Sequence, residues 1–122
     1  MILVACLLLT TGITSGEAAG GAGCSLASIT VTQAATGEWA HGQPVRAVTV
    51  RNTCACAQSD VEVDCVGFDS DLAVDPSKLR PTGGERCLVN GGAPVVQGRD
   101  VTFAYASSSQ FGFRPVYSLV SC

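Results

Sequence analysis

The sequence has little of what common catalytic, metal-binding and nucleic-acid-binding sites require. Its 122 residues include one histidine, His41, and seven Lys and Arg residues that are scattered along the chain. A basic stripe that could neutralise phosphates is missing, so nucleic acid is not an expected partner. His41 lies in the loop-like stretch 39–44, and the chain has no Gly-x-Ser-x-Gly motif. Ser–His catalysis is therefore not expected, and we predict that the protein is not an enzyme.

Long apolar runs are also scarce. The longest, from Ile2 to Leu9, is too short to span a bilayer and is followed by small residues. That pattern is typical of a secretory signal. We expect residues 1–18 to be a signal peptide, with cleavage after Ala18 or Ala22, and residues 24–122 to form one domain. The mature chain should then be secreted and extracellular, without membrane insertion.

Cysteine is the residue type in which the chain is rich. Removal of the signal also removes Cys6 and leaves an even number, which in a secreted chain predicts disulfide bonds. These six are Cys24, Cys54, Cys56, Cys65, Cys87 and Cys122. A structural zinc site would need a second Cys pair or two histidines, so neither a metal nor a cofactor is expected.

The spacing of Cys54 and Cys56 restricts the pairing. On a strand their Cα atoms would be about 6.6 Å apart, near the upper limit for a disulfide, so a bond between them would be strained. Each is expected to bond a distant partner. The other pairings stay open.

Hydrophobic residues beyond Cys24 recur with period two, and Gly, Pro, Asn and Asp interrupt them every eight to twelve residues. This rhythm is typical of a β-sandwich, and no helical stripe occurs. We predict a small, all-β, disulfide-stapled sandwich without a helical core. Its expected strands are Ser28–Gln33, Pro44–Asn52, Asp60–Cys65, Val101–Ala106 and Val116–Cys122, and turns are expected at 75–78, 81–85 and 90–94.

Three carboxylates, Asp60, Glu62 and Asp64, alternate with Val61, Val63 and Cys65. On a strand the acids would share one face, roughly 6 to 7 Å apart, which is close enough for an acid and base to flank a glycosidic bond. A strand with one charged and one apolar face most simply exposes its charges to water. We therefore expect a solvated face or a charged edge strand, with a calcium or catalytic site as the alternative. Asp69-Ser-Asp71 and the paired glycines are expected to be turns.

The seven aromatic residues leave one further possibility open. In a chain of this size several of them must fill the core, but exposed ones could stack on a sugar. The candidates are Trp39, Tyr105, Phe111, Phe113 and Tyr117.

The order of motifs from Cys24 onward resembles the plant tapetum determinant family of small, secreted, cysteine-rich proteins. The pieces that carry this resemblance are Cys24, Ile29-Thr-Val-Thr-Gln33, Val48-Thr-Val-Arg-Asn52 before Cys54, Val63-Asp-Cys65-Val-Gly-Phe68, Cys87-Leu-Val-Asn-Gly91, Val101-Thr-Phe-Ala-Tyr-Ala106 and the closing Val120-Ser-Cys122. They extend over nearly the whole expected mature chain.

This resemblance implies a non-enzymatic signalling ligand in the apoplast. The implied partner is the leucine-rich-repeat ectodomain of a receptor kinase, and the implied role is cell-fate specification in the anther, especially of the tapetum. The residues themselves leave two alternatives: an extracellular carbohydrate-binding module at the cell wall, and a secreted inhibitor of hydrolases.

Overall fold

The computed structural model describes residues 23–122. The expected signal peptide, both expected cleavage positions and Cys6 lie outside these residues. The described part consists of β-strands with two three-residue 3₁₀ turns, η2 (Leu26–Ser28) and η3 (Asn90–Gly92). Neither turn is long or apolar enough to cross a membrane.

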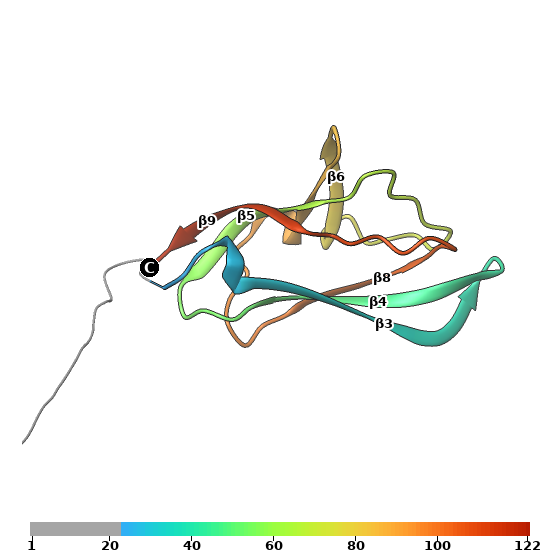
Figure 1. The fold of residues 1–122 in the computed structure, drawn as a ribbon, viewed down its shortest axis with the longest axis horizontal. Helices are drawn as coiled ribbons and strands as arrows, with labels where there is room; N and C mark the ends of the chain where they lie inside the picture. The colour runs from blue at the N-terminus through green and yellow to red at the C-terminus, as the bar shows by residue number, and fades with distance from the viewer. Residues whose placement is uncertain (1–22) are drawn as a thin grey trace, which may run out of the picture.

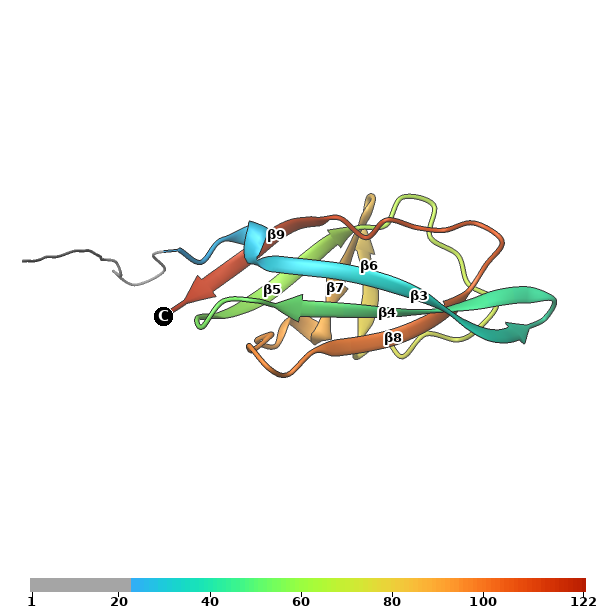
Figure 2. The same cartoon turned by 60° about the horizontal axis from the view of Figure 1, so that its bottom comes forward.

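Two antiparallel sheets form the domain, as Figures 1 and 2 show. The three-stranded sheet has the order β3-β4-β8 and the four-stranded sheet has the order β6-β7-β5-β9. The strands of the first sheet are β3 (Ile29–Ala40), β4 (Gln43–Asn52) and β8 (Val101–Ala106). Those of the second sheet are β5 (Ala57–Asp64), β6 (Leu79–Gly83), β7 (Arg86–Val89) and β9 (Pro115–Ser121). The prediction of an all-β, disulfide-stapled sandwich is confirmed.

The core lies between the two sheets and follows from the alternation of the strands. Val101, Phe103 and Tyr105 alternate along β8 and are all buried, so they form its inward face. Opposite them, β5 contributes Val61 and Val63, both fully buried. One end of the core is aromatic, with ring centroids 5.1 to 6.2 Å apart, which suits edge-to-face packing. Its members are Phe68, Tyr105, Phe111 and Phe113.

Strands β3 and β4 form a hairpin that is longer than the sequence suggested. The expected strand ended at Gln33, whereas β3 continues to Ala40 after an irregularity between Ala35 and Trp39. His41 and Gly42 form the two-residue turn, with φ values of 52° and 78°. Two successive positive φ values match the type I′ turn, whose twist suits a hairpin. The stretch expected to be loop-like is therefore the tip of a hairpin, which projects past the other strands (Figures 1 and 2).

Strand β5 is an interior strand, because it pairs with β7 on one side and β9 on the other. The alternative that Asp60–Cys65 is an edge strand is therefore wrong. A bulge at Asp60, where φ is 50°, inserts one extra residue opposite β9. This shift allows both Gln58 and Val61 to point into the interior although they are three residues apart.

The segment 79–89 forms a hairpin that the sequence did not reveal. Strand β6 includes Pro81 and Thr82, which were expected to belong to a turn, and only Gly84 and Glu85 separate it from β7. Proline is tolerated there because β6 is at the edge of its sheet and does not need every N–H. The turn expected at 90–94 is present, with positive φ at Asn90, Gly91 and Gly92.

Candidate functional site

Three disulfides join the six cysteines of residues 23–122. Cys24 bonds Cys54, Cys56 bonds Cys122, and Cys65 bonds Cys87, with Cα atoms 5.6, 4.7 and 5.9 Å apart. Cys54 and Cys56 thus bond two different and distant parts of the chain. The Cys65–Cys87 bridge connects the residue after β5 to β7 inside the core, where both cysteines are buried.

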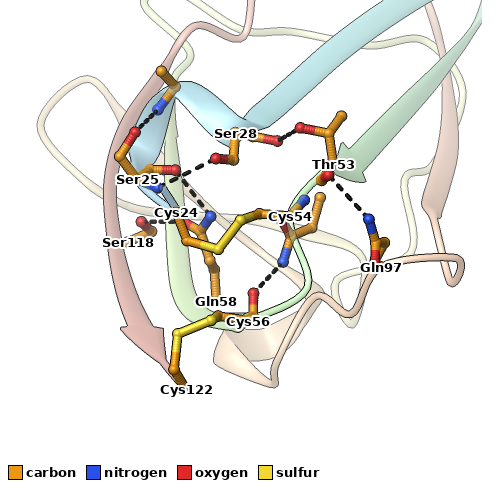
Figure 3. The surroundings of a disulfide bond; sticks show 12 residues. Cys24, Ser25, Ser28, Thr53, Cys54, Cys56, Gln58, Gln97, Ser118 and Cys122 are labelled. Atoms are coloured by element: carbon orange, nitrogen blue, oxygen red, sulfur yellow. Dashed lines mark hydrogen bonds between the residues drawn. A yellow bond between two sulfur atoms is a disulfide. The ribbon is translucent and has the colours of Figure 1, made fainter. Parts of the chain in front are cut away.

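The other two disulfides lie side by side at one end of the sandwich (Figure 3). The sulfur atoms of Cys24, Cys56 and Cys122 are all within 4.8 Å of one another. They fasten the start of the described chain and the end of β9 to the short loop between β4 and β5. Three thiolates this close could ligate a metal, but here all three sulfurs are consumed in disulfide bonds.

Two buried amides organise the same end of the molecule. The Asn52 side chain donates to the carbonyl oxygens of Cys56 and Val95, at 2.8 and 2.9 Å, and accepts from the Cys54 amide. Gln58 donates to the Ser25 carbonyl and accepts from the Ser118 hydroxyl (Figure 3). Because buried amides are costly when unpaired, these bonds hold the converging segments in one arrangement.

The three alternating carboxylates do not form a catalytic pair. Asp60 is exposed at the bulge, while Glu62 and Asp64 are half-buried. Glu62 pairs with Arg86 at 3.2 Å, and Asp64 pairs with Arg114 at 3.5 Å. The acid of a glycosidase is a carboxyl group enclosed in an apolar pocket, whereas Glu62 and Asp64 are each paired with an arginine and Asp60 is exposed. They are part of the solvated face of the sheet, which was the favoured interpretation.

The other motifs are also structural. The Ser70 hydroxyl between Asp69 and Asp71 accepts from the Ala106 amide and donates to the Leu72 carbonyl, so this stretch fastens a loop to the end of β8. Gly83 is the last residue of β6 and Gly84 follows it in the turn, while Gly91 and Gly92 lie in η3; all four have positive φ. His41 is an exposed turn residue.

A hollow of about 340 Å³ lies between the end of β5 and the segment before β9. Phe111 and Phe113 contribute apolar surface to it, and the paired Asp64 and Arg114 also line it. The residues that line it offer no nucleophile or general base other than Asp64, since Cys65 is bonded to Cys87. The hollow can accommodate a small apolar group but has no catalytic set of side chains. Sequence reasoning missed it because segments 64–66 and 110–114 meet only in the folded chain.

Charged groups at the surface are modestly perturbed. Hydrogen bonds from Arg51 lower the pKa of Asp100, and the same bonds raise the pKa of Arg51. The Ser77 amide and hydroxyl lower the pKa of Asp75. Each is a local hydrogen bond in an exposed setting, and neither acid lines the hollow. These shifts indicate surface structure rather than acid–base chemistry.

The aromatic candidates divide into two groups. Tyr105 and Phe113 are buried and therefore unavailable as a sugar platform, and Phe111 is half-buried against their rings. Trp39 is 68% exposed and Tyr117 is 41% exposed. These two belong to different sheets, on β3 and β9. An extended aromatic platform is therefore not formed, and Trp39 is the most exposed large hydrophobic side chain of residues 23–122.

Comparison with known proteins identifies the family. A family model described as "Tapetum determinant 1, C-terminal" matches residues 25–122. The chain is 33% identical over 118 residues to "TPD1 protein homolog 1" of Arabidopsis thaliana, an alignment that covers 95% of this chain and 65% of that protein. It is 35% identical over 89 residues to "TPD1 protein homolog 1A" of Oryza sativa subsp. japonica, which covers 66% of this chain and 38% of that protein.

A third relative, "TPD1 protein homolog 1B" of Oryza sativa subsp. japonica, is 33% identical over 100 residues, which is 81% of this chain and 58% of that protein. The chain thus spans less than two thirds of the length of each of these three relatives. No solved structure matches it. The family match covers the whole β-sandwich, and the chain therefore belongs to the tapetum determinant family.

Proposed function

We propose that the chain is a secreted, non-enzymatic protein ligand that is recognised in the apoplast by the leucine-rich-repeat ectodomain of a receptor kinase. The proposed role is cell-fate specification in the anther, especially of the tapetum. The observation that carries this proposal is membership of the tapetum determinant family over residues 25–122. The function implied by the sequence resemblance depends on this family assignment.

The architecture supports a role in binding. Three disulfides hold a domain of two sheets whose strands pair antiparallel throughout, so the domain has little freedom to lose on association. A preorganised surface binds with a smaller entropy cost than a flexible one. Leucine-rich-repeat solenoids present extended concave surfaces, on which a rigid domain of this size can lie.

The cysteine chemistry supports action outside the cell. All six cysteines of residues 23–122 are oxidised, and disulfides persist in secreted proteins but are rare in the reducing cytosol. The apolar run from Ile2 to Leu9 is consistent with the secretory route. A fluorescent protein fused after Cys122 should therefore reach the apoplast, and deletion of residues 1–22 should retain it inside the cell.

A direct binding titration tests the proposal. Refolded, oxidised residues 23–122 would be measured against a panel of leucine-rich-repeat receptor-kinase ectodomains and, in parallel, against an array of cell-wall glycans. Saturable binding to one ectodomain, with no glycan bound, is the expected result. The reduced and alkylated chain is the control, because loss of the disulfides should remove the binding surface.

Two results would contradict the proposal. The first is saturable glycan binding with no ectodomain bound, which would favour the carbohydrate-binding module instead. The second is inhibition of a secreted hydrolase in the absence of any ectodomain binding. The anther role has its own test: secreted expression should restore the tapetum in plants that lack a tapetum determinant protein, and failure to restore it would contradict that role.

A further inference from the structure

The outer end of the β3–β4 hairpin carries a surface that the rest of the domain does not cover. Figure 2 shows this hairpin extending past the other strands. Near its tip, Trp39 has 68% of its surface exposed, although tryptophan side chains are usually largely buried in a monomer. The side chains of Ala34, Ala35, Thr36 and Ala40 on the same strand are small. None of them is large enough to cover the indole ring.

The strand register places Trp39 and Arg46 on one face of this hairpin. Trp39 is paired with Pro44, and Arg46 is paired with Ala35 on one side and Tyr105 on the other. Directly paired residues share a face, and so do residues two apart on a strand such as Pro44 and Arg46. We call the surface formed by Ala35, Trp39, Pro44 and Arg46 the hairpin face.

The hairpin face continues the inner face of the three-stranded sheet. Tyr105, the neighbour of Arg46, packs in the aromatic cluster and donates a hydrogen bond to Gln33. Arg46 is half-buried at the border of this covered region, and Trp39 lies beyond it. The sheet therefore presents its inner, apolar side to solvent where the second layer ends.

The Arg46 side chain has a buried hydrogen-bond donor without an acceptor. Its Nε is the buried side-chain nitrogen or oxygen of residues 23–122 that has no hydrogen-bond partner. By contrast, the guanidinium groups of Arg51, Arg86 and Arg114 each pair with a carboxylate. A buried donor without an acceptor is unfavourable, and no carboxylate of residues 23–122 pairs with Arg46. Nε itself is covered by the domain, but the side chain as a whole is only half-buried, so a carboxylate from a partner can pair with the part of it that stays accessible.

We infer that the hairpin face is the surface by which this ligand contacts its receptor ectodomain, an inference that rests on the proposed function. The partner surface that fits is an apolar pocket for the Trp39 ring beside an Asp or Glu carboxylate that pairs with Arg46. Tryptophan and arginine are the residue types most enriched among those that dominate binding energy at protein interfaces. Trp39 supplies apolar area, and Arg46 supplies charge complementarity.

The test compares variants for binding to the ectodomain that captures the wild-type chain, by biolayer interferometry. Trp39→Ala should weaken binding about thirtyfold and Arg46→Gln about tenfold, effects of the size found at interface centres. Trp39→Phe should retain part of the affinity. The matched controls are Tyr117→Ala, which removes an exposed aromatic from the other sheet, and Arg99→Gln, which removes an exposed arginine; both should bind like the wild type. Thermal unfolding of each variant checks that the fold is intact.

Salt dependence separates the role of Arg46 from a general loss of charge. Raising the salt concentration should slow association of the wild-type chain, and the dependence should be smaller for Arg46→Gln but unchanged for Arg99→Gln. If the wild-type chain binds an ectodomain and the Trp39 and Arg46 variants bind equally well, the inference is wrong while the proposed function stands. If the wild-type chain binds no ectodomain, both fail. Glycan binding that is lost on Trp39→Ala would also overturn the inference about the hairpin face, because it would identify the tryptophan as a sugar contact.

Discussion

The disulfide between Cys56 and Cys122 allows the clearest prediction of stability. It closes a loop with a sequence separation of 66, the longest of the three. In the chain-entropy description, a loop of that length restricts the unfolded chain enough to be worth about 4.3 kcal/mol at 25 °C. Domains of this size have a free energy of unfolding of roughly 5 to 15 kcal/mol. Loss of this one bridge should therefore remove a large part of the net stability.

The perturbation is the double variant Cys56→Ser with Cys122→Ser. Both residues must be replaced, because a single replacement would leave a thiol whose sulfur lies within 4.8 Å of the Cys24 sulfur. Such a thiolate could attack the Cys24–Cys54 bridge and rearrange it. Cys122 is exposed and Cys56 is half-buried, so serine in their place creates little cavity. The effect should thus come mainly from the lost cross-link.

The assay is urea denaturation followed by circular dichroism and by fluorescence. With an m-value of about 1.5 kcal/mol/M, a loss of about 4.3 kcal/mol lowers the midpoint by about 3 M. Ser121→Ala, an exposed change beside the bridge, is the control and should stay within about 0.5 kcal/mol of the wild type. A double variant that unfolds within about 1 kcal/mol of the wild type would refute the reasoning. In that case the β5–β9 ladder alone would hold the end of β9.

Three further predictions concern the core, a turn and the surface. Phe113→Ala should lower the free energy of unfolding by about 3 to 5 kcal/mol, because the ring is fully buried among other aromatic rings. The same urea denaturation measures this, and a loss under about 1 kcal/mol would contradict it. Gly92→Ala should lower the free energy of unfolding by more than about 1 kcal/mol, since φ is +86° and the new Cβ would meet Asp60 Oδ1 at 2.9 Å. The same change made in an Asp60→Gly background should cost less, because the carboxylate is gone. An equal cost in both backgrounds would exclude the clash. Hydrogen bonds from Arg51 lower the pKa of Asp100 below 3.8, so their contribution to stability is present above that pH and is lost as the pH falls through the folded-state pKa. In thermal unfolding from pH 6 to pH 2, Asp100→Asn should therefore be less stable than the wild type at the upper end, and this difference should shrink as the pH falls; a constant difference would count against the prediction.

Much of the fold could be read from local patterns. The alternation in 101–106 indicates which side chains of β8 share a face, because side-chain direction in a strand depends only on position along it. The same reasoning predicted that Val61, Val63 and Cys65 share a buried face. It failed for segment 79–89, where proline and glycine suggested a turn, because their tolerance there depends on β6 being an edge strand. The interior position of β5 was also missed, because it depends on pairing with the distant strands β7 and β9.

The surfaces proposed for function were less predictable. Seven aromatic residues offered no local signal that Trp39 would be exposed while Phe113 would be enclosed. That distinction depends on where the second sheet ends, which is a property of the whole fold. Arg46 likewise lies in an ordinary strand pattern, and only the folded domain shows that its Nε is buried without an acceptor.

The sequence by itself determined the fold class, the use of cysteine for cross-links and the family. It also indicated that Cys54 and Cys56 would have different partners, which is confirmed, although both lie in the loop between β4 and β5 and not on the strand that the reasoning assumed. Only the tertiary structure decided that Cys24 bonds Cys54, Cys56 bonds Cys122 and Cys65 bonds Cys87, and which face of the hairpin remains open. The physical reason is that these features depend on which distant segments meet, and this is decided by how both sheets bury their apolar faces together.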